Sequence, residues 1–200
     1  MQQDIVSGKE YLSATFNNVV MSDASVIEAE FEGCQFIECN FTETTFRKCK
    51  FIDCVFKRCN LSVLKVPLSQ FNGVHFEECK MVGVDWTRAA WPRYAFAASI
   101  QFCKCVLNDS SFFGLSLDEL VLEECKAHDV DFREGRFNKA NFTYTDFTNS
   151  LFGKTHLAGA DFSEAIQYDI DIFNNTLTGA RFTRHEAVRL LNGLEIELVD

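Results

Sequence analysis

The chain has 200 residues, a formal net charge of −10 and an apolar fraction of 47%, with 21 Phe, 9 Cys and 2 Pro. A chain of this length forms one or two domains, and its acidity argues against direct nucleic-acid binding and for a basic partner. No apolar run reaches the ~18 residues of a membrane span, and no basic segment precedes an apolar one at the N-terminus. We expect a soluble cytoplasmic protein without a signal peptide.

From Tyr11 onward, every fifth residue is apolar. These central positions run to Trp91, and a second run, shifted by one residue, extends from Phe102 to Phe182. The 34 central positions hold 18 of the 21 Phe, and only Gln167 among them is polar. A chain that turns a corner once per repeat keeps two of every five side chains inward. Four corners make a square coil of 20 residues, and such coils stack at the strand spacing of ~4.8 Å.

The position two residues before each centre, called here the small-residue position, is mostly occupied by small side chains. Eight of the nine Cys occur there, and only Cys103 does not. Spacings such as Cys49, Cys54 and Cys59 are multiples of five and differ from the C-x₂₋₄-C pairs of zinc sites. We interpret these cysteines as small buried apolar residues, and we expect no metal, cofactor or catalytic residue.

Residues 39–43 (CNFTE), 140–144 (ANFTY) and 160–164 (ADFSE) carry the repeat in full. This pattern resembles the consensus of the pentapeptide-repeat family, and the resemblance covers residues ~11–182. It implies an all-β fold, a right-handed quadrilateral β-helix. Residues 1–10 would then be an N-terminal lead-in, residues 11–182 the β-helix, and residues 183–200 a C-terminal helix and tail that form a cap.

The two runs are separated by one residue more than the period allows. Either the register slips by one residue with Phe96 as a centre, or residues 92–97 leave the coil as a small loop. Pro92 lacks a backbone donor and suits a point of departure, which favours the loop. Because loops on rigid scaffolds often bind partners, Arg93 and Tyr94 are candidate contacts.

After Phe182 the pattern changes to that of a helix. Thr183 and Glu186 fit a capping box. The apolar residues at helical spacing are Ala187, Leu190, Leu191 and Leu194. They offer more apolar surface than one cap buries, so we expect a two-fold homodimer through this end.

The C-terminal half carries most of the charge, with a net −8 for residues 101–200 against −2 for residues 1–100. Four residues spaced 20 apart are predicted to stack in one outer column: Asp109, Asp129, Asn149 and Asp169. Three further acids are expected nearby: Asp131, Asp146 and Asp171. The column is either a solvated polar face or an acidic stripe that imitates a phosphate backbone.

Further segments are similar to the branch of the family that protects type II topoisomerases. They are residues 81–87 (MVGVDWT), 107–110 (LNDS), 169–173 (DIDIF) and 190–198 (LLNGLEIEL). The chain resembles the albicidin-resistance members along nearly its whole length. It resembles quinolone-resistance (Qnr) and microcin B17 immunity proteins more distantly, and it lacks the larger loop that many Qnr proteins carry.

The resemblance implies a non-enzymatic dimeric rod that binds DNA gyrase or topoisomerase IV and relieves a poison, either albicidin-like or a quinolone. A structural or scaffold solenoid that binds another protein is the alternative.

Overall fold

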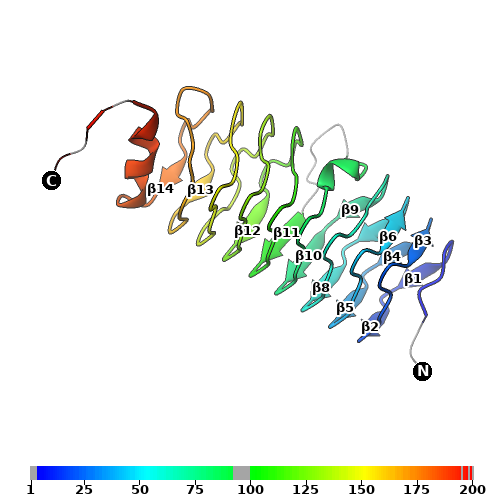
Figure 1. The fold of residues 1–200 in the computed structure, drawn as a ribbon. Helices are drawn as coiled ribbons and strands as arrows, with labels where there is room; N and C mark the ends of the chain where they lie inside the picture. The colour runs from blue at the N-terminus through cyan, green and yellow to red at the C-terminus, as the bar shows by residue number, and fades with distance from the viewer. Residues whose placement is uncertain (1–3, 92–99, 195, 198, 200) are drawn as a thin grey trace.

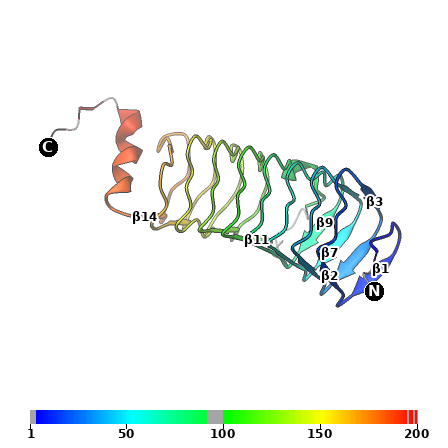
Figure 2. The same ribbon diagram turned by 60° about the horizontal axis from the view of Figure 1, so that its bottom comes forward.

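The chain forms a parallel β-solenoid, a rod of stacked coils with the N-terminus at one end and a helix across the other (Figures 1 and 2). The computed structural model describes residues 4–91, 100–194, 196–197 and 199. The predicted all-β coil is confirmed, because every strand pairing in the described residues is parallel and joins one coil to the next.

Each coil has four faces, numbered here in chain order from Tyr11. The first face carries β1 (Glu10–Leu12), β4 (Glu30–Glu32), β7 (Lys50–Ile52) and β9 (Gln70–Asn72). The second carries β2 (Thr15–Asn17), β5 (Gln35–Ile37), β8 (Val55–Lys57), β10 (Val74–Glu77), β11 (Ile100–Cys103), β12 (Val121–Glu123), β13 (Asp161–Phe162) and β14 (Arg181–Phe182). The third face consists of isolated bridges such as Val20↔Asn40. The fourth carries β3 (Ser25–Ile27), β6 (Thr45–Arg47) and the short 3₁₀ helix η1 (Trp86–Arg88).

The core is a set of aromatic columns along the rod axis. Phe16 pairs with Phe36 and Phe36 with Phe56, so the register between these coils is the predicted 20 residues. The rings of Phe36 and Phe56 stack with centroids 4.3 Å apart. Within a coil, rings such as Phe41 and Phe46 meet edge to face at 5.5 Å. Both geometries are favourable for aromatic pairs, so the Phe residues at the centres stabilise the interior through ring contacts within and between coils.

The chain turns at the residue two positions after each centre, called here the corner position. Corner residues have a left-handed backbone, with φ of 59° at Glu43 and 71° at Gly83. A corner N–H points along the rod, as where Glu43 donates to the Ser62 carbonyl of the next coil at 2.9 Å. Because this conformation is costly for most L-residues, corners favour Gly, Asn and Asp.

The small-residue positions satisfy backbone carbonyls inside the core. Cys59 Sγ donates to the Phe36 carbonyl at 3.3 Å, and Ser69 Oγ donates to the Phe46 carbonyl at 2.8 Å. The acceptor in each case is the central residue of the preceding coil. All eight cysteines at these positions are buried, as predicted. Burial raises the pKa of the Cys54 thiol to about 12, which keeps it protonated.

The interruption adds six residues to one coil. Phe76 pairs with Phe102 and Asp85 with Ser111, an offset of 26 instead of 20. A single-residue slip would have given an offset of 21. The predicted loop at 92–97 lies outside the described residues.

Near the C-terminus the register departs from the predicted one. Leu151 pairs with Asp169, an offset of 18 residues. The buried Ile170 therefore follows Phe152 on the fourth face, and the prediction of a centre at Ile172 was wrong. The coil is two residues short at this face, which the five-residue period could not reveal.

The predicted centre at Gln167 was also wrong. Gln167 is exposed and has φ of 57°, whereas the adjacent Tyr168 is fully buried. The Tyr168 ring packs on Phe162 and Phe182, with centroids 5.6 and 5.4 Å away. A large side chain at the shortened coil thus fills the space of a missing centre.

The C-terminal helix η2 (Glu186–Leu194) closes the end of the ladder (Figure 2). Thr183 Oγ1 accepts from the corner N–H of Glu164 at 2.6 Å, and Glu186 Oε1 accepts from Gln167 N–H at 2.7 Å. These oxygens replace the carbonyls that a further coil would supply. The predicted capping box is corrected accordingly, because its two side chains accept hydrogen bonds from backbone N–H groups of the solenoid, and Glu186 Oε1 also lies 3.6 Å from Arg189 Nε of the helix.

Replacing one central aromatic should open a cavity that the rigid stack cannot close. Phe46→Ala should lower the free energy of unfolding by about 3–5 kcal/mol, measured by urea denaturation. Leu12→Ala, at a side chain that is 70% exposed, is the control and should change it by less than about 0.5 kcal/mol. Equal effects of the two substitutions would contradict the role given to the aromatic columns.

Candidate protein-binding surfaces

The third-face corners carry exposed carboxylates in the C-terminal half. Asp109 and Asp129 are corner residues with φ of 59° and 56°, and both side chains are exposed. Their N–H groups donate to the His128 and Thr148 carbonyls, which confirms that they lie one coil apart. Within the described part of the chain, neither carboxylate forms an ion pair. We call Asp109, Asp129 and the following corner Asn149 the acidic corner.

Asp169 does not continue the acidic corner, so this part of the predicted column was wrong. The 18-residue offset moves Asp169 to the fourth face, beyond Leu151 and in line with Asp131. Its Oδ1 accepts a hydrogen bond of 2.9 Å from Arg189 of η2. This carboxylate therefore helps to hold the helix on the last coil.

Asp131 and Asp146 are mainly structural. Asp131 Oδ2 lies 2.8 Å from Arg133 Nη2, and Asp146 Oδ2 lies 2.8 Å from His128 Nε2. Burial raises the pKa of each carboxyl, but hydrogen bonds from Arg133, and from Thr148 and His128, outweigh it and hold each pKa below its ordinary value. Because both carboxylates already have partners within the chain, they are less available to a binding partner than those of the acidic corner.

Three further residues were predicted to contact a partner, and the structure describes only one of them, Asp171 near the end of the rod. Asp171 is exposed and accepts a hydrogen bond of 2.8 Å from the Phe173 N–H. Arg93 and Tyr94 lie outside the described residues.

The predicted dimer residues line one end of the rod. Leu190 packs against the core. Ala187, Leu191 and Leu194 are half-buried. Nearby, Phe173 is 76% exposed and Val188 is 46% exposed. The end therefore carries apolar surface that the described residues do not cover.

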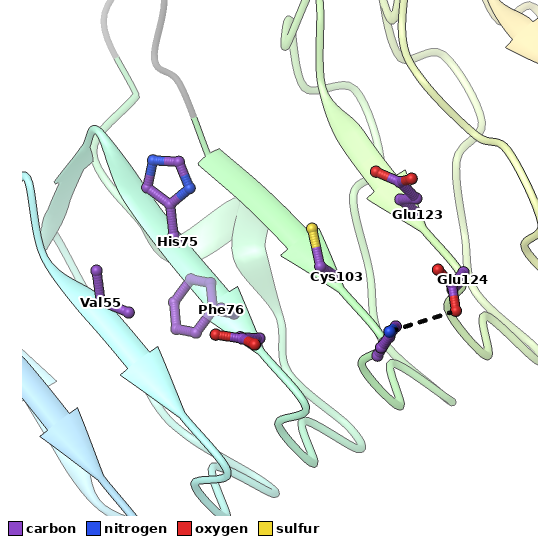
Figure 3. A pocket seen from close by; sticks show the side chains of 8 residues that line it. Val55, His75, Phe76, Cys103, Glu123 and Glu124 are labelled. Carbon is purple, nitrogen blue, oxygen red and sulfur yellow. Dashed lines mark ion pairs between the residues drawn. The ribbon is translucent and has the colours of Figure 1, made fainter.

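A shallow hollow of about 350 Å³ lies on the second face, across β8, β10, β11 and β12 (Figure 3). Its floor includes Cys103, the only Cys of the nine that is not buried, between His75 and Glu123. Burial and the nearby carboxylates Glu123 and Glu77 raise the pKa of this thiol. Among the described residues, no group of three or more His, Cys, Asp and Glu could hold a metal ion.

A second hollow of about 380 Å³ lies on the fourth face, where it joins the third. Its lining includes the exposed residues Val63, Lys65 and Arg88 and the half-buried Pro67. The five-residue period did not predict this fourth-face hollow, because the period fixes which side chains point inward and not the shape of the outer surface. The available signal was the aliphatic residue Val63 in a third-face column whose other left-handed corners are Asp, Glu, Asn or Gly.

The repeat and the fold place the chain in a known class. The profile of the pentapeptide repeat region matches residues 29–100 and 84–162, and that of pentapeptide repeats (8 copies) matches residues 13–42. The chain belongs to the pentapeptide-repeat family. A search of the curated proteins gives no match.

Two solved structures show the same fold. Trypsin-treated QnrB1, a plasmid-mediated fluoroquinolone resistance protein, is 20% identical, with a TM-score of 0.81 over 97% of both chains. Full-length QnrB1 is 16% identical, with a TM-score of 0.68 over 94% of this chain and 100% of that one. No helix in the described part of the chain has the length and apolarity that a membrane crossing requires.

The paired carboxylates of Asp131 and Asp146 should make the stability of the fold depend on pH. Because the folded-state pKa values of Asp131 and Asp146 lie below the unfolded value of ~3.9, their stabilisation is present above pH ~4. It is lost as pH falls through the lower folded values. The urea concentration at the unfolding midpoint should therefore decrease as the pH is lowered below ~4. The double variant Asp131→Asn with Asp146→Asn should show a smaller decrease. The exposed Asp129→Asn is the control, and an unchanged profile in the double variant would contradict the assignment.

Proposed function

We propose that this chain binds bacterial DNA gyrase, and also topoisomerase IV, and protects the enzyme from a topoisomerase poison. The observation that carries the proposal is a rod like that of QnrB1 over 97% of both chains, with exposed carboxylates at its corners. The rod would occupy the basic surface on which the enzyme holds DNA. The poison would be albicidin-like, from the sequence resemblance, or a quinolone. The protein would act in the cytoplasm.

Charge and spacing support this mode of binding. Successive corners such as Asp109 and Asp129 are one coil apart, or ~4.8 Å, which approaches the charge spacing along one strand of a nucleic acid. Carboxylates without an internal partner remain free to meet Lys and Arg on another protein. Attraction between exposed charges of opposite sign raises the association rate and weakens with salt.

A supercoiling assay with gyrase tests the proposal, with albicidin in one arm and a quinolone in the other. Increasing amounts of the protein should restore supercoiling in at least one arm. At higher amounts the protein should inhibit supercoiling by competing with DNA. If there is no rescue with either drug and no inhibition at any amount, the proposal is wrong and a scaffold role stands in its place.

Reversing the acidic corner should weaken gyrase binding without unfolding. Asp109→Lys with Asp129→Lys should raise the dissociation constant by about tenfold or more, measured by surface plasmon resonance at two salt concentrations. The control is Glu119→Lys with Glu134→Lys, which makes the same charge change at exposed corners of other faces. Equal losses in the two variants would mean that net charge, and not this corner, sets the affinity.

We also propose a two-fold homodimer through η2 and the last coil, supported by the exposed Phe173 and Val188. Such a dimer would double the rod length, with the acidic halves at its centre. Leu191→Glu should give monomers in sedimentation velocity, because the dimer would bury an unpaired charge. Leu12→Glu at the other end is the control and should stay dimeric. A wild-type protein that is monomeric at micromolar concentration would contradict the dimer.

A further inference from the structure

Two successive corners of one coil are built from aliphatic residues. Val63 and Leu68 have left-handed backbones, with φ of 56° and 60°, and their side chains are 44% and 55% exposed. This conformation is unfavourable for L-residues and most of all for a β-branched one. An exposed aliphatic side chain recovers little of that cost by burial. The fold alone gives no reason for these two residues.

The neighbouring corners show what the fold prefers. Along the third face, the corners on either side of Val63 are Glu43 and Gly83, and the next is Asp109. In the described part of the chain, the other non-glycine residues with positive φ are polar or charged, apart from Tyr144. The coil of Val63 and Leu68 therefore differs from the other coils in having aliphatic residues at two corners. Costly local conformations that persist in a folded protein are concentrated at functional sites.

One of the two aliphatic corners lines the fourth-face hollow. Val63 lines it together with Pro67, and Leu68 directly follows Pro67 in the chain, at the next corner and outside the lining. The hollow is about 380 Å³, which is room for one or two aliphatic side chains of another protein. Exposed apolar side chains gathered around a concave surface are typical of a protein contact.

The rim of the hollow is basic, although the chain as a whole has a net charge of −10. Lys65 lines the hollow, and Arg47 lies on the same face one coil earlier. Both are exposed, and neither forms an ion pair within the described residues. Arg88 also lines the hollow and is paired at 3.1 Å with Asp85, the one carboxylate among the lining residues, so Lys65 and Arg88 leave the lining with a net positive charge. The chemistry that fits is an aliphatic side chain with carboxylates beside it.

We propose that the fourth-face hollow binds an aliphatic, acidic segment of the same topoisomerase that the acidic corner engages. This inference rests on the proposed function and adds a second, unlike contact to it. The acidic corner would speed association through long-range charge, and the hollow would slow dissociation through short-range apolar contact. The two contacts together would fix which face of the rod meets the enzyme.

The test replaces both aliphatic corners by the residue that their backbone prefers. Val63→Asn with Leu68→Asn should raise the thermal midpoint by about 2–4 °C for each residue, because Asn tolerates the left-handed backbone. The same variant should weaken gyrase binding by about tenfold or more, mainly through faster dissociation. A gain in stability combined with a loss of affinity is the expected signature, since a purely structural role would lower both.

Two comparisons complete the experiment. Leu12→Asn with Val20→Asn removes two aliphatic side chains that are 70% and 72% exposed at the N-terminal end, and it should leave the affinity within about twofold. Lys65→Glu should also weaken binding, and high salt should restore part of that loss.

The failures of the two proposals are distinguishable. If the wild-type protein does not bind gyrase, the proposed function and this inference are both wrong. If the wild type binds and the Val63 and Leu68 variant binds equally well, or loses affinity and stability together, only this inference is overturned.

Discussion

The left-handed corner is the constraint on which the solenoid depends. The coils close because the chain turns at residues whose left-handed backbone most amino acids disfavour, and most corner N–H groups then bond to the next coil. This geometry sends the central side chains inward and leaves the corner side chains in water. The corners are therefore where the sequence is free to carry charge, as at Asp129, or apolar surface, as at Val63. Stability and partner contact are thus assigned to different residues of the same repeat.

The five-residue period predicted the fold because each central residue has one role. An aromatic side chain at a centre fills the core, and a small residue two positions earlier bonds to a carbonyl beneath it, as Cys59 does. The same period misplaced Gln167 and Ile172, because it assumes that every coil has full length. Tyr168 makes the shortened coil possible, since its one large ring fills the volume that a regular centre would occupy. Packing of this kind depends on side-chain volume in three dimensions, which cannot be predicted from the spacing of residues along the sequence.

The candidate surfaces were predicted less completely than the fold. Residue spacing correctly stacked Asp109 on Asp129, but it could not show which carboxylates have partners. The partner of Asp146 is His128, which is 18 residues away in sequence and in the adjacent coil. The aliphatic corners escaped notice for a different reason, since Val63 and Leu68 are unusual only once the corners are known to be left-handed. A search for residues that conflict with the local backbone would find such sites in other solenoids.

The six-residue interruption has a consequence for how such rods change length during evolution. Coils on both sides of it keep their neighbours in line, since Phe76 pairs with Phe102 and Asp85 with Ser111 in spite of the six extra residues. Duplicating a whole coil would lengthen the rod by ~4.8 Å and preserve each vertical alignment of side chains. An insertion of any other length must leave the coil, and a shortened coil, such as the one before Ile170, must be compensated by a bulky residue. Natural variation in rod length is therefore expected in steps of one whole coil.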